Sequence, residues 1–373
     1  MQSQQKIGKK GNRRMINKFI NQHILDLKKY DPVDSDKKLA EEFGLKEKDI
    51  IRLNANENPY GPWEGLEDSF SEIKLNVYPD SNQDLLRESL SKYTGLNKDQ
   101  IVAGSGADEM IECIFKIFCN KNDILIDVQP TFGMYSFLAD SIGMKVIPFE
   151  RDLDWSINID KLKKEIGISS AKLIFLASPN NPTGNSLPNE DLEEILKLGI
   201  LVVVDETYFE FCGSTSVKMI KNYENLIILR SFSKWAGIAG LRIGYMLANS
   251  EIIDNVFKVK QPYNINVVAE KAAILTLENR IDLQFNIEKI LSEKKVFAKF
   301  IDNLDGVNAF SSDANFILCK FSKNGGEFIF NKLAREGIFV RSFSNENLKD
   351  CLRFTIGTTN QMKKVKDVLK ATN

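Results

Sequence analysis

The feature that most limits the fold of this 373-residue chain is a series of short apolar runs that do not alternate with polar residues. The segments between these runs, such as 109–118 and 189–198, have apolar residues at helical spacing. The runs are rich in β-branched residues and lie at 101–103, 123–128, 172–177, 201–204 and 226–229. A strand without a polar face must be covered on both sides, so the pattern predicts a mostly parallel α/β sheet between helices. Ligands of such sheets bind beyond the carboxyl ends of the strands.

The pattern changes after Asn266, and the length of the chain favours two domains over one core. Two long helical stretches come first, and residues 308–373 then have a strand, helix, strand, strand, helix pattern typical of a smaller α+β domain. We expect four parts: a basic, flexible tail at 1–25, an N-terminal arm at 26–75 that packs with the small domain, a large domain at 76–280 and the small domain at 281–373.

Composition excludes several classes of function. The 50 Lys and Arg residues nearly balance the 51 Asp and Glu residues, which argues against a nucleic-acid partner and favours a small-molecule substrate. No apolar run is long enough to span a membrane. The single histidine, His23, makes a Ser-His-Asp hydrolase improbable, and five cysteines without a CxxC pair predict no metal site. Unpaired cysteines are typical of a cytoplasmic protein.

Polar motifs follow the predicted strands at the points where the strands end. SPNNPTG follows the run at 172–177, DETY follows the run at 201–204, and SFSK follows the run at 226–229. GSGADE follows the first run in the same way, at 104–109. One such cluster would be an ordinary loop or helix cap, but four at the same edge of one sheet predict a site.

The chemistry of these motifs is that of an aldehyde cofactor with a pyridine ring and a phosphate. Lys234 supplies an amine that can form a Schiff base, and Asp205 supplies an acid that can keep a pyridine nitrogen protonated. Hydroxyls, an arginine and the free amides at a helix start suit a phosphate. Any one of these residues alone would be read as a surface lysine or a helix cap; together they indicate pyridoxal 5′-phosphate.

The chain resembles the fold-type I pyridoxal-phosphate aminotransferases, and among them the histidinol-phosphate aminotransferase branch. Further stretches that carry this resemblance are LNANENPYGP, VYPD, PTFGMY, PYNIN, ANFIL and CLRFTIGT, which together with the loop motifs span residues 53–358. The resemblance implies a large domain with a mostly parallel seven-stranded sheet. It also implies a smaller α+β domain formed by the N- and C-terminal segments.

The resemblance gives each matching residue a role toward the cofactor. Lys234 would bind the cofactor covalently and move a proton at the substrate's α-carbon, while Asp205 would pair with the pyridine nitrogen. Asn181 and Tyr208 would hydrogen-bond the phenolic oxygen, and Phe132 would stack on the ring. The residues that would hold the phosphate are Ala107, Asp108, Ser231, Ser233 and Arg242.

Other matching residues imply contacts with the substrate and with a second subunit. Arg353 aligns with an arginine that binds the α-carboxylate of the amino donor as a bidentate fork. Arg341 occupies the place of a second anion ligand, Tyr30 resembles a tyrosine that closes over the substrate, and Asn56 is a further pocket residue. Tyr78 matches a tyrosine that reaches the phosphate of the neighbouring subunit's cofactor, which implies a homodimer.

The implied reaction is transamination of L-histidinol phosphate with 2-oxoglutarate, giving imidazole-acetol phosphate and L-glutamate in histidine biosynthesis. Aromatic-amino-acid aminotransferases and threonine-phosphate decarboxylases share the motifs and stay open as alternatives. A regulator would need a helix-turn-helix segment that the sequence lacks, and a nicotinamide-dependent dehydrogenase leaves Lys234 unexplained. Thr207, where the family usually has alanine, and Trp235 are departures for which we predict no role.

Overall fold

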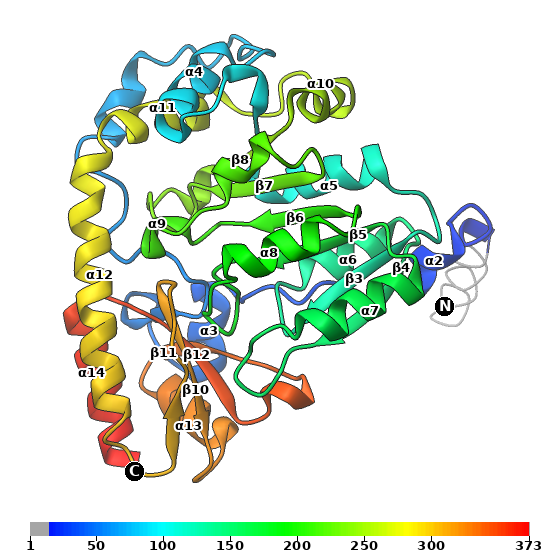
Figure 1. Ribbon diagram of the computed structural model, residues 1–373. Coiled ribbons are helices and arrows are strands. Elements are labelled where there is room, and N and C mark those ends of the chain that lie inside the picture. Colours follow the sequence, from blue (N-terminus) through cyan, green and yellow to red (C-terminus); the bar gives the residue numbers. More distant parts are fainter. Residues whose placement is uncertain (1–14, 373) are drawn as a thin grey trace, which may run out of the picture.

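The computed structural model describes residues 15–372, so most of the expected basic tail, residues 1–14, lies outside the described residues. Two sheets organise the chain (Figure 1). The larger sheet has seven strands in the order β2-β8-β7-β6-β5-β3-β4. These are β2 (Ile101–Gly104), β3 (Ile124–Gln129), β4 (Lys145–Glu150), β5 (Leu173–Ala177), β6 (Leu201–Asp205), β7 (Leu226–Ser231) and β8 (Gly244–Ala248).

The larger sheet confirms the predicted fold class. Strands β4, β3, β5, β6 and β7 are parallel to their neighbours, and β8 runs antiparallel between β7 and β2. Its central strands are buried on both faces because successive residues enter two different cores. Val203 and Ile227 pack with helices on one face, whereas Val204 and Ile228 pack on the other.

The smaller sheet has five strands in the order β1-β11-β12-β10-β9. Strand β1 (Ile51–Leu53) pairs in parallel with β11 (Ile338–Ser342), so a segment from the N-terminal part joins strands from the C-terminal part. The expected N-terminal arm, residues 26–75, thus contributes one three-residue strand to this sheet. The remaining strands are antiparallel: β9 (Val307–Ala309), β10 (Phe316–Phe321) and β12 (Cys351–Thr355).

Helices cover both sheets. One core contains residues of α5, α6 and α10, and the other contains residues of α7, α8, α11 and α12. The helices are α2 (Gln22–Asp26), α3 (Asp36–Phe43), α4 (Asp84–Thr94), α5 (Gly106–Phe118), α6 (Met134–Ser141), α7 (Ile159–Ser169), α8 (Asn189–Leu196), α9 (Phe209–Cys212), α10 (Ser250–Val259), α11 (Val267–Glu278), α12 (Arg280–Ile301), α13 (Gly326–Arg335) and α14 (Thr359–Thr372). In residues 15–372 none of them is both long and apolar enough for a membrane span.

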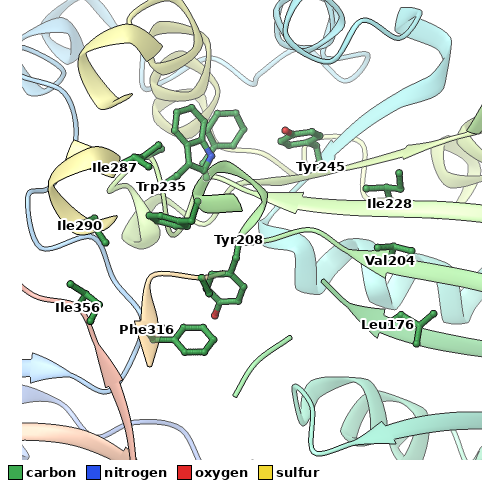
Figure 2. Packing of buried hydrophobic residues seen from close by; sticks show 14 of the residues in the cluster. Leu176, Val204, Tyr208, Ile228, Trp235, Tyr245, Ile287, Ile290, Phe316 and Ile356 are labelled. Carbon is green, nitrogen blue, oxygen red and sulfur yellow. The ribbon is translucent and has the colours of Figure 1, made fainter. Parts of the chain in front are cut away.

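A continuous apolar cluster joins the two sheets. Leu176, Val204 and Ile228 come from the larger sheet, and Phe316 comes from the smaller one (Figure 2). Helix α12 runs alongside both sheets in Figure 1 and adds Ile287 to the same cluster. The edge of the larger sheet that carries the polar motifs is therefore held against the smaller sheet. The four-part division of the chain stays a prediction.

Candidate active site

Strand register brings the polar motifs to one edge of the larger sheet. Ala177, Asp205 and Leu229 are direct partners across β5, β6 and β7, so these parallel strands end at the same level. Ser231 pairs with Gly244, which in turn pairs with Gly104 at the end of β2. The loops that follow β2, β5, β6 and β7 thus begin side by side.

Asp205 lies at the centre of this edge and is 6% exposed. Its Oδ2 accepts a hydrogen bond from the Tyr135 hydroxyl at 2.6 Å. Its Oδ1 accepts two, from the Thr207 amide at 3.0 Å and from the Thr207 hydroxyl at 2.5 Å. Burial raises the pKa of Asp205, and the bonds from Thr207 and Tyr135 oppose that rise.

Lys234 extends from the loop after β7 with its Nζ 2.7 Å from the carbonyl oxygen of Ala55. Burial, and next the positive charge of Arg353, lower the pKa of Lys234 to about 8. A share of the amine is therefore neutral near physiological pH. Only a neutral amine is a nucleophile, so the environment of Lys234 favours reaction with a carbonyl.

The start of α5 and the loop after β7 form a cradle. The Ser231 hydroxyl donates a hydrogen bond to the Ser233 hydroxyl at 2.9 Å. Arg242 Nη2 donates to Asp108 Oδ2, also at 2.9 Å. Gly106 has φ +80°, and a Cβ there would lie 2.5 Å from Arg242 Nη2. A Cβ at Gly244 would similarly lie 2.5 Å from the amide nitrogen of Ala107. The cradle therefore combines hydroxyls, a cation and the amides at a helix start. Its backbone has no room for a side chain at Gly106 or Gly244.

Tyr208 packs against the smaller sheet, with the centre of its ring 5.2 Å from that of Phe316. Its hydroxyl accepts a hydrogen bond from Asn56 Nδ2 at 2.8 Å, and burial raises the pKa of the phenol. Asn56, whose φ is +56°, is held in turn by Thr355, which donates from its hydroxyl to Asn56 Oδ1 at 3.0 Å. Asn56 therefore reaches the site as the partner of Tyr208.

Arg353 is 5% exposed and has no ion pair in residues 15–372. It donates to the Oδ1 of Asn181 and to the carbonyl oxygen of Asn54, while its Nε has no partner among the described residues. Burial lowers its pKa to about 10. Arg341 stands directly opposite Arg353 across β11 and β12. Two like charges facing each other are unfavourable, so an anion near this pair would be stabilising.

Tyr30 lies close to this arginine pair. Its ring is 5.7 Å from Phe137 in an edge-on contact, and Arg341 Nη2 is 3.5 Å from the carbonyl oxygen of the adjacent Asp31. Burial is the main cause that raises the pKa of Tyr30, and the charge of Arg341 opposes it. The N-terminal segment thus contacts Arg341 on β11.

Two predicted ring residues differ in their placement. Phe132 makes an edge-on contact with Tyr135 at 5.6 Å, which puts it beside the partner of Asp205. Tyr78 instead lies on the surface, 77% exposed, and stacks on Tyr263 at 4.5 Å. Within one chain, the described structure therefore does not bring Tyr78 into the cluster around Lys234.

Tyr135 and Thr207 were assigned no role from the sequence, yet both donate hydrogen bonds to Asp205. Tyr135 is 70 residues away from Asp205 in the sequence, so no local pattern predicts their contact. Thr207 is two residues away, and a hydroxyl so close to a carboxylate is a local signal that could have been used. The Trp235 ring is buried against Tyr93, and its carbonyl oxygen accepts from Asn58, so Trp235 fixes the Lys234 loop.

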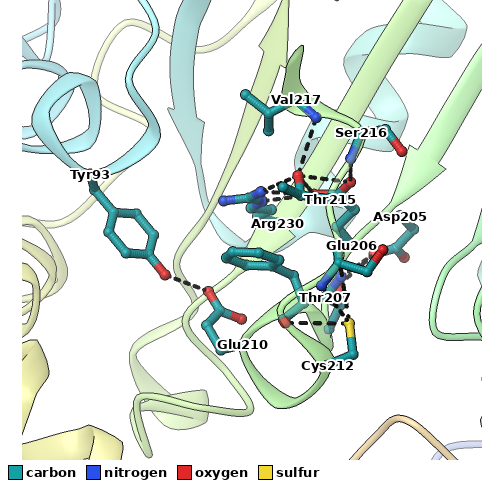
Figure 3. A network of polar contacts seen from close by, with 12 residues as sticks. Tyr93, Asp205, Glu206, Thr207, Glu210, Cys212, Thr215, Ser216, Val217 and Arg230 are labelled. Carbon is teal, nitrogen blue, oxygen red and sulfur yellow. Dashed lines mark hydrogen bonds and ion pairs between the residues drawn. The ribbon is translucent and has the colours of Figure 1, made fainter. Parts of the chain in front are cut away.

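The acid that follows Asp205 belongs to a separate network. Glu206 forms a buried ion pair with Arg230 at 2.8 Å, with side chains 2% and 3% exposed (Figure 3). Thr215 donates to Glu206 as well, and the guanidinium carbon of Arg230 lies 3.7 Å from the centre of the Phe209 ring. Asp205 ends β6 and faces the site, whereas the side chain of Glu206, the next residue, points away from it into the core.

The residues present fit pyridoxal 5′-phosphate. Asp205 is a buried acid with no cationic partner among residues 15–372, Lys234 is an amine of lowered pKa, and the Gly106 cradle suits a phosphate. The unpartnered Nε of Arg353 suits a carboxylate of a substrate. Together these groups can hold a phosphorylated aldehyde and an anionic amine side by side.

Comparison with known proteins gives a consistent result. Residues 48–369 match the family model of aminotransferases of class I and II. The histidinol-phosphate aminotransferase of Roseiflexus castenholzii is 36% identical over 364 residues, covering 95% of this chain and 98% of that protein. The crystal structure of the histidinol-phosphate aminotransferase from Clostridium acetobutylicum is 29% identical with a TM-score of 0.80, covering 87% and 99% of the two chains.

A second solved structure resembles this chain in fold. The histidinol-phosphate aminotransferase from Sinorhizobium meliloti, in complex with pyridoxal-5′-phosphate, has a TM-score of 0.84. It is 22% identical and covers 95% of this chain and 98% of that one.

Proposed function

This chain belongs to the class I and II aminotransferases, and on that premise we propose that it transfers the amino group of L-histidinol phosphate to 2-oxoglutarate. The products are imidazole-acetol phosphate and L-glutamate, a step of histidine biosynthesis. The family works with pyridoxal 5′-phosphate. The names of the relatives at 36–40% identity support this substrate.

The observation that carries the substrate proposal is the pair Arg353 and Arg341. The two arginines are direct cross-strand partners, and neither forms an ion pair with an acidic side chain in residues 15–372. 2-Oxoglutarate and glutamate carry two carboxylates, and histidinol phosphate carries a phosphate. Both kinds of substrate therefore supply anions for the same cationic pair.

When bound, the cofactor supplies an aldehyde that accepts amines and a ring that withdraws electrons. Lys234 would hold it covalently and move a proton at the α-carbon of the substrate. Asp205 would keep the ring nitrogen protonated, Tyr208 and Asn181 would hydrogen-bond the phenolic oxygen, and Phe132 would stack on the ring. Ala107, Asp108, Ser231, Ser233 and Arg242 would hold the phosphate.

Further residues complete the substrate side of the pocket. Arg353 already donates to Asn181, and its Nε, which has no partner in the part of the chain that the structure describes, can donate to an anion. Arg341 is the second anion ligand, Tyr30 covers the bound substrate, and Asn56 fixes Tyr208. These contacts orient the amine toward Lys234 and exclude water from the proton that moves.

We propose further that the enzyme is a homodimer in which Tyr78 reaches the partner's cofactor phosphate. The exposed ring of Tyr78, together with exposed Leu75 and Val77 beside it, supports an interface at this surface. We place the enzyme in the cytoplasm, a location supported by five cysteines that form no disulfide. Its partners are small-molecule substrates.

A half-reaction panel tests the substrate. The purified protein, reconstituted with cofactor, is mixed separately with histidinol phosphate, phenylalanine, tyrosine and O-phosphothreonine, and the visible spectrum is followed. We expect histidinol phosphate to convert the cofactor to its aminated form fastest, and the Lys234→Ala variant to show no conversion. Faster conversion by phenylalanine or tyrosine would identify an aromatic aminotransferase, and release of carbon dioxide from O-phosphothreonine would identify a decarboxylase.

A further inference from the structure

Asp205 is held by side chains on both of its oxygens. Tyr135 donates to Oδ2 at 2.6 Å, and the Thr207 hydroxyl donates to Oδ1 at 2.5 Å. The backbone amide of Thr207 also reaches Oδ1, at 3.0 Å. The backbone bond is available to any residue at position 207, whereas the hydroxyl bond requires threonine or serine.

The environment of Asp205, the acid that accepts from the Thr207 hydroxyl, disfavours its ionised form. Asp205 is almost fully buried, and the acid Asp108 is the further charge that raises its pKa. The other titratable side chains around it are Tyr135 on α6 and Tyr208, both neutral phenols whose pKa is raised. Hydrogen bonds to the ionised form are the structural features that oppose this environment, and Thr207 contributes more to them than Tyr135 does.

We propose that Thr207 is a positioning residue for the cofactor, whose hydroxyl holds Asp205 ionised and aimed at the ring nitrogen. The proposal rests on the cofactor contact assigned to Asp205 above. Thr207 does not touch the reacting atoms and acts through Asp205. A carboxylate fixed on both oxygens cannot rotate away from the ring, so part of its alignment is present before the cofactor arrives.

Two substitutions separate the hydroxyl from the shape of the side chain. Thr207→Val keeps the branched shape and removes the donor, whereas Thr207→Ser keeps the donor and removes a methyl group. Thr207→Ala serves if valine impairs folding. Thr276→Val is a matched control, because Thr276 is fully buried and its hydroxyl has no partner among the described residues.

The measurements are the dissociation constant of pyridoxal 5′-phosphate for each cofactor-free protein, and the ring-nitrogen ¹⁵N shift of labelled cofactor. We expect Thr207→Val and Thr207→Ala to bind roughly 5- to 50-fold more weakly, with the ¹⁵N shift moved toward a neutral pyridine. Thr207→Ser and Thr276→Val should match the wild type. The melting temperature of the cofactor-free protein should change little.

The outcomes distinguish this inference from the proposed function. If the wild type binds the cofactor and Thr207→Val binds it equally well with an unchanged ¹⁵N shift, the role of Thr207 is wrong while the proposed function stands. An equal loss in Thr207→Ser would also overturn it, because the hydroxyl would then not be the determinant. If the wild type itself binds no cofactor, the proposed function fails first.

Discussion

At the scale of single residues, burial raises the pKa of two acids near the site, Asp205 and Glu210. Glu206 forms a buried ion pair with Arg230, whereas Glu210, one turn further, forms none among residues 15–372. Glu210 accepts a hydrogen bond from Tyr93 at 3.2 Å through Oε1, and its Oε2 has no partner among residues 15–372. Burial raises the pKa of Glu210 to about 8, against the effect of Arg230. A pKa of about 8 favours the protonated form of Glu210 in the folded protein at neutral pH.

Because the pKa of Glu210 is raised on folding, we expect the free energy of unfolding to depend on pH. Between pH 4.5, the ordinary pKa of a glutamate, and about pH 8, its pKa in the folded protein, the carboxyl of Glu210 is protonated when folded and ionised when unfolded. The folded state then binds more protons, so the free energy of unfolding falls as pH rises through this window. Glu210→Gln removes the effect and should be more stable than the wild type at pH 8 by on the order of 2 kcal/mol. Urea unfolding of both proteins at pH 5, 6, 7 and 8 measures it.

At pH 5 the two proteins should have nearly equal free energies of unfolding. Parallel pH profiles over the whole range would show that Glu210 is ionised in the folded state. Glu210→Asp is a useful second variant, because it keeps the titration and should retain the pH slope.

At the scale of elements, the site depends on loops that touch through backbone atoms. Gly237, in the loop after Lys234, has φ +70°, and a Cβ there would lie 2.1 Å from the carbonyl oxygen of Gly61. Asn58 bonds the same loop by donating to the carbonyl oxygen of Trp235 at 2.9 Å. The segment at 54–62 and the Lys234 loop are therefore held together, and Ala55 is positioned to accept from Lys234.

Gly237→Ala should separate these two loops. Strain at positive φ and a backbone clash should lower the free energy of unfolding by about 2–4 kcal/mol and weaken cofactor binding. Gly240→Ala is the matched control, because it lies in the same loop and its Cβ would meet nothing within 4 Å. Denaturant unfolding and a cofactor titration measure both variants. Equal behaviour of the two variants would show that the close approach to Gly61 is not required.

Some strands can be predicted from the sequence, and others cannot. The apolar runs locate five strands of the larger sheet, because burial on both faces leaves a clear pattern. Strand β4 contains Pro148 and lies at an edge with partly exposed residues, so its pattern is weak. Strands β1 and β9 have three residues each, too few to show a period. The positions of Lys234 and Asp205 followed from local motifs, but the contact of Asp205 with Tyr135 depends on tertiary packing.

At the scale of the whole molecule, Tyr78 is separate from the site of its own chain. It is exposed and stacks on Tyr263. Nearby, Lys260 is 8% exposed and donates to the carbonyl oxygens of Ser81 and Gln261, which holds the loops of both tyrosines together. A rigid, exposed aromatic pair of this kind suits a contact with a second copy of the chain.

Mixing two inactive variants tests whether Tyr78 serves the partner subunit. Lys234→Ala and Tyr78→Ala are purified separately, then combined, dissociated and reassociated. A hybrid dimer has one site with both Lys234 and the partner's tyrosine, so random mixing should restore about a quarter of wild-type activity. Tyr78→Phe is the control that keeps the stacking on Tyr263. If the mixture stays inactive although hybrids form, Tyr78 does not act across an interface.

The alignment of β5, β6 and β7 at Ala177, Asp205 and Leu229 has a consequence for assembly. A slip of β6 by one residue would turn Asp205 away from the ligand and present Glu206 instead. Affinity for the vitamin-derived group therefore discriminates between a correctly registered strand and its nearest misfolded competitor. Binding of the cofactor stabilises only the former, so it favours the correct register of β6.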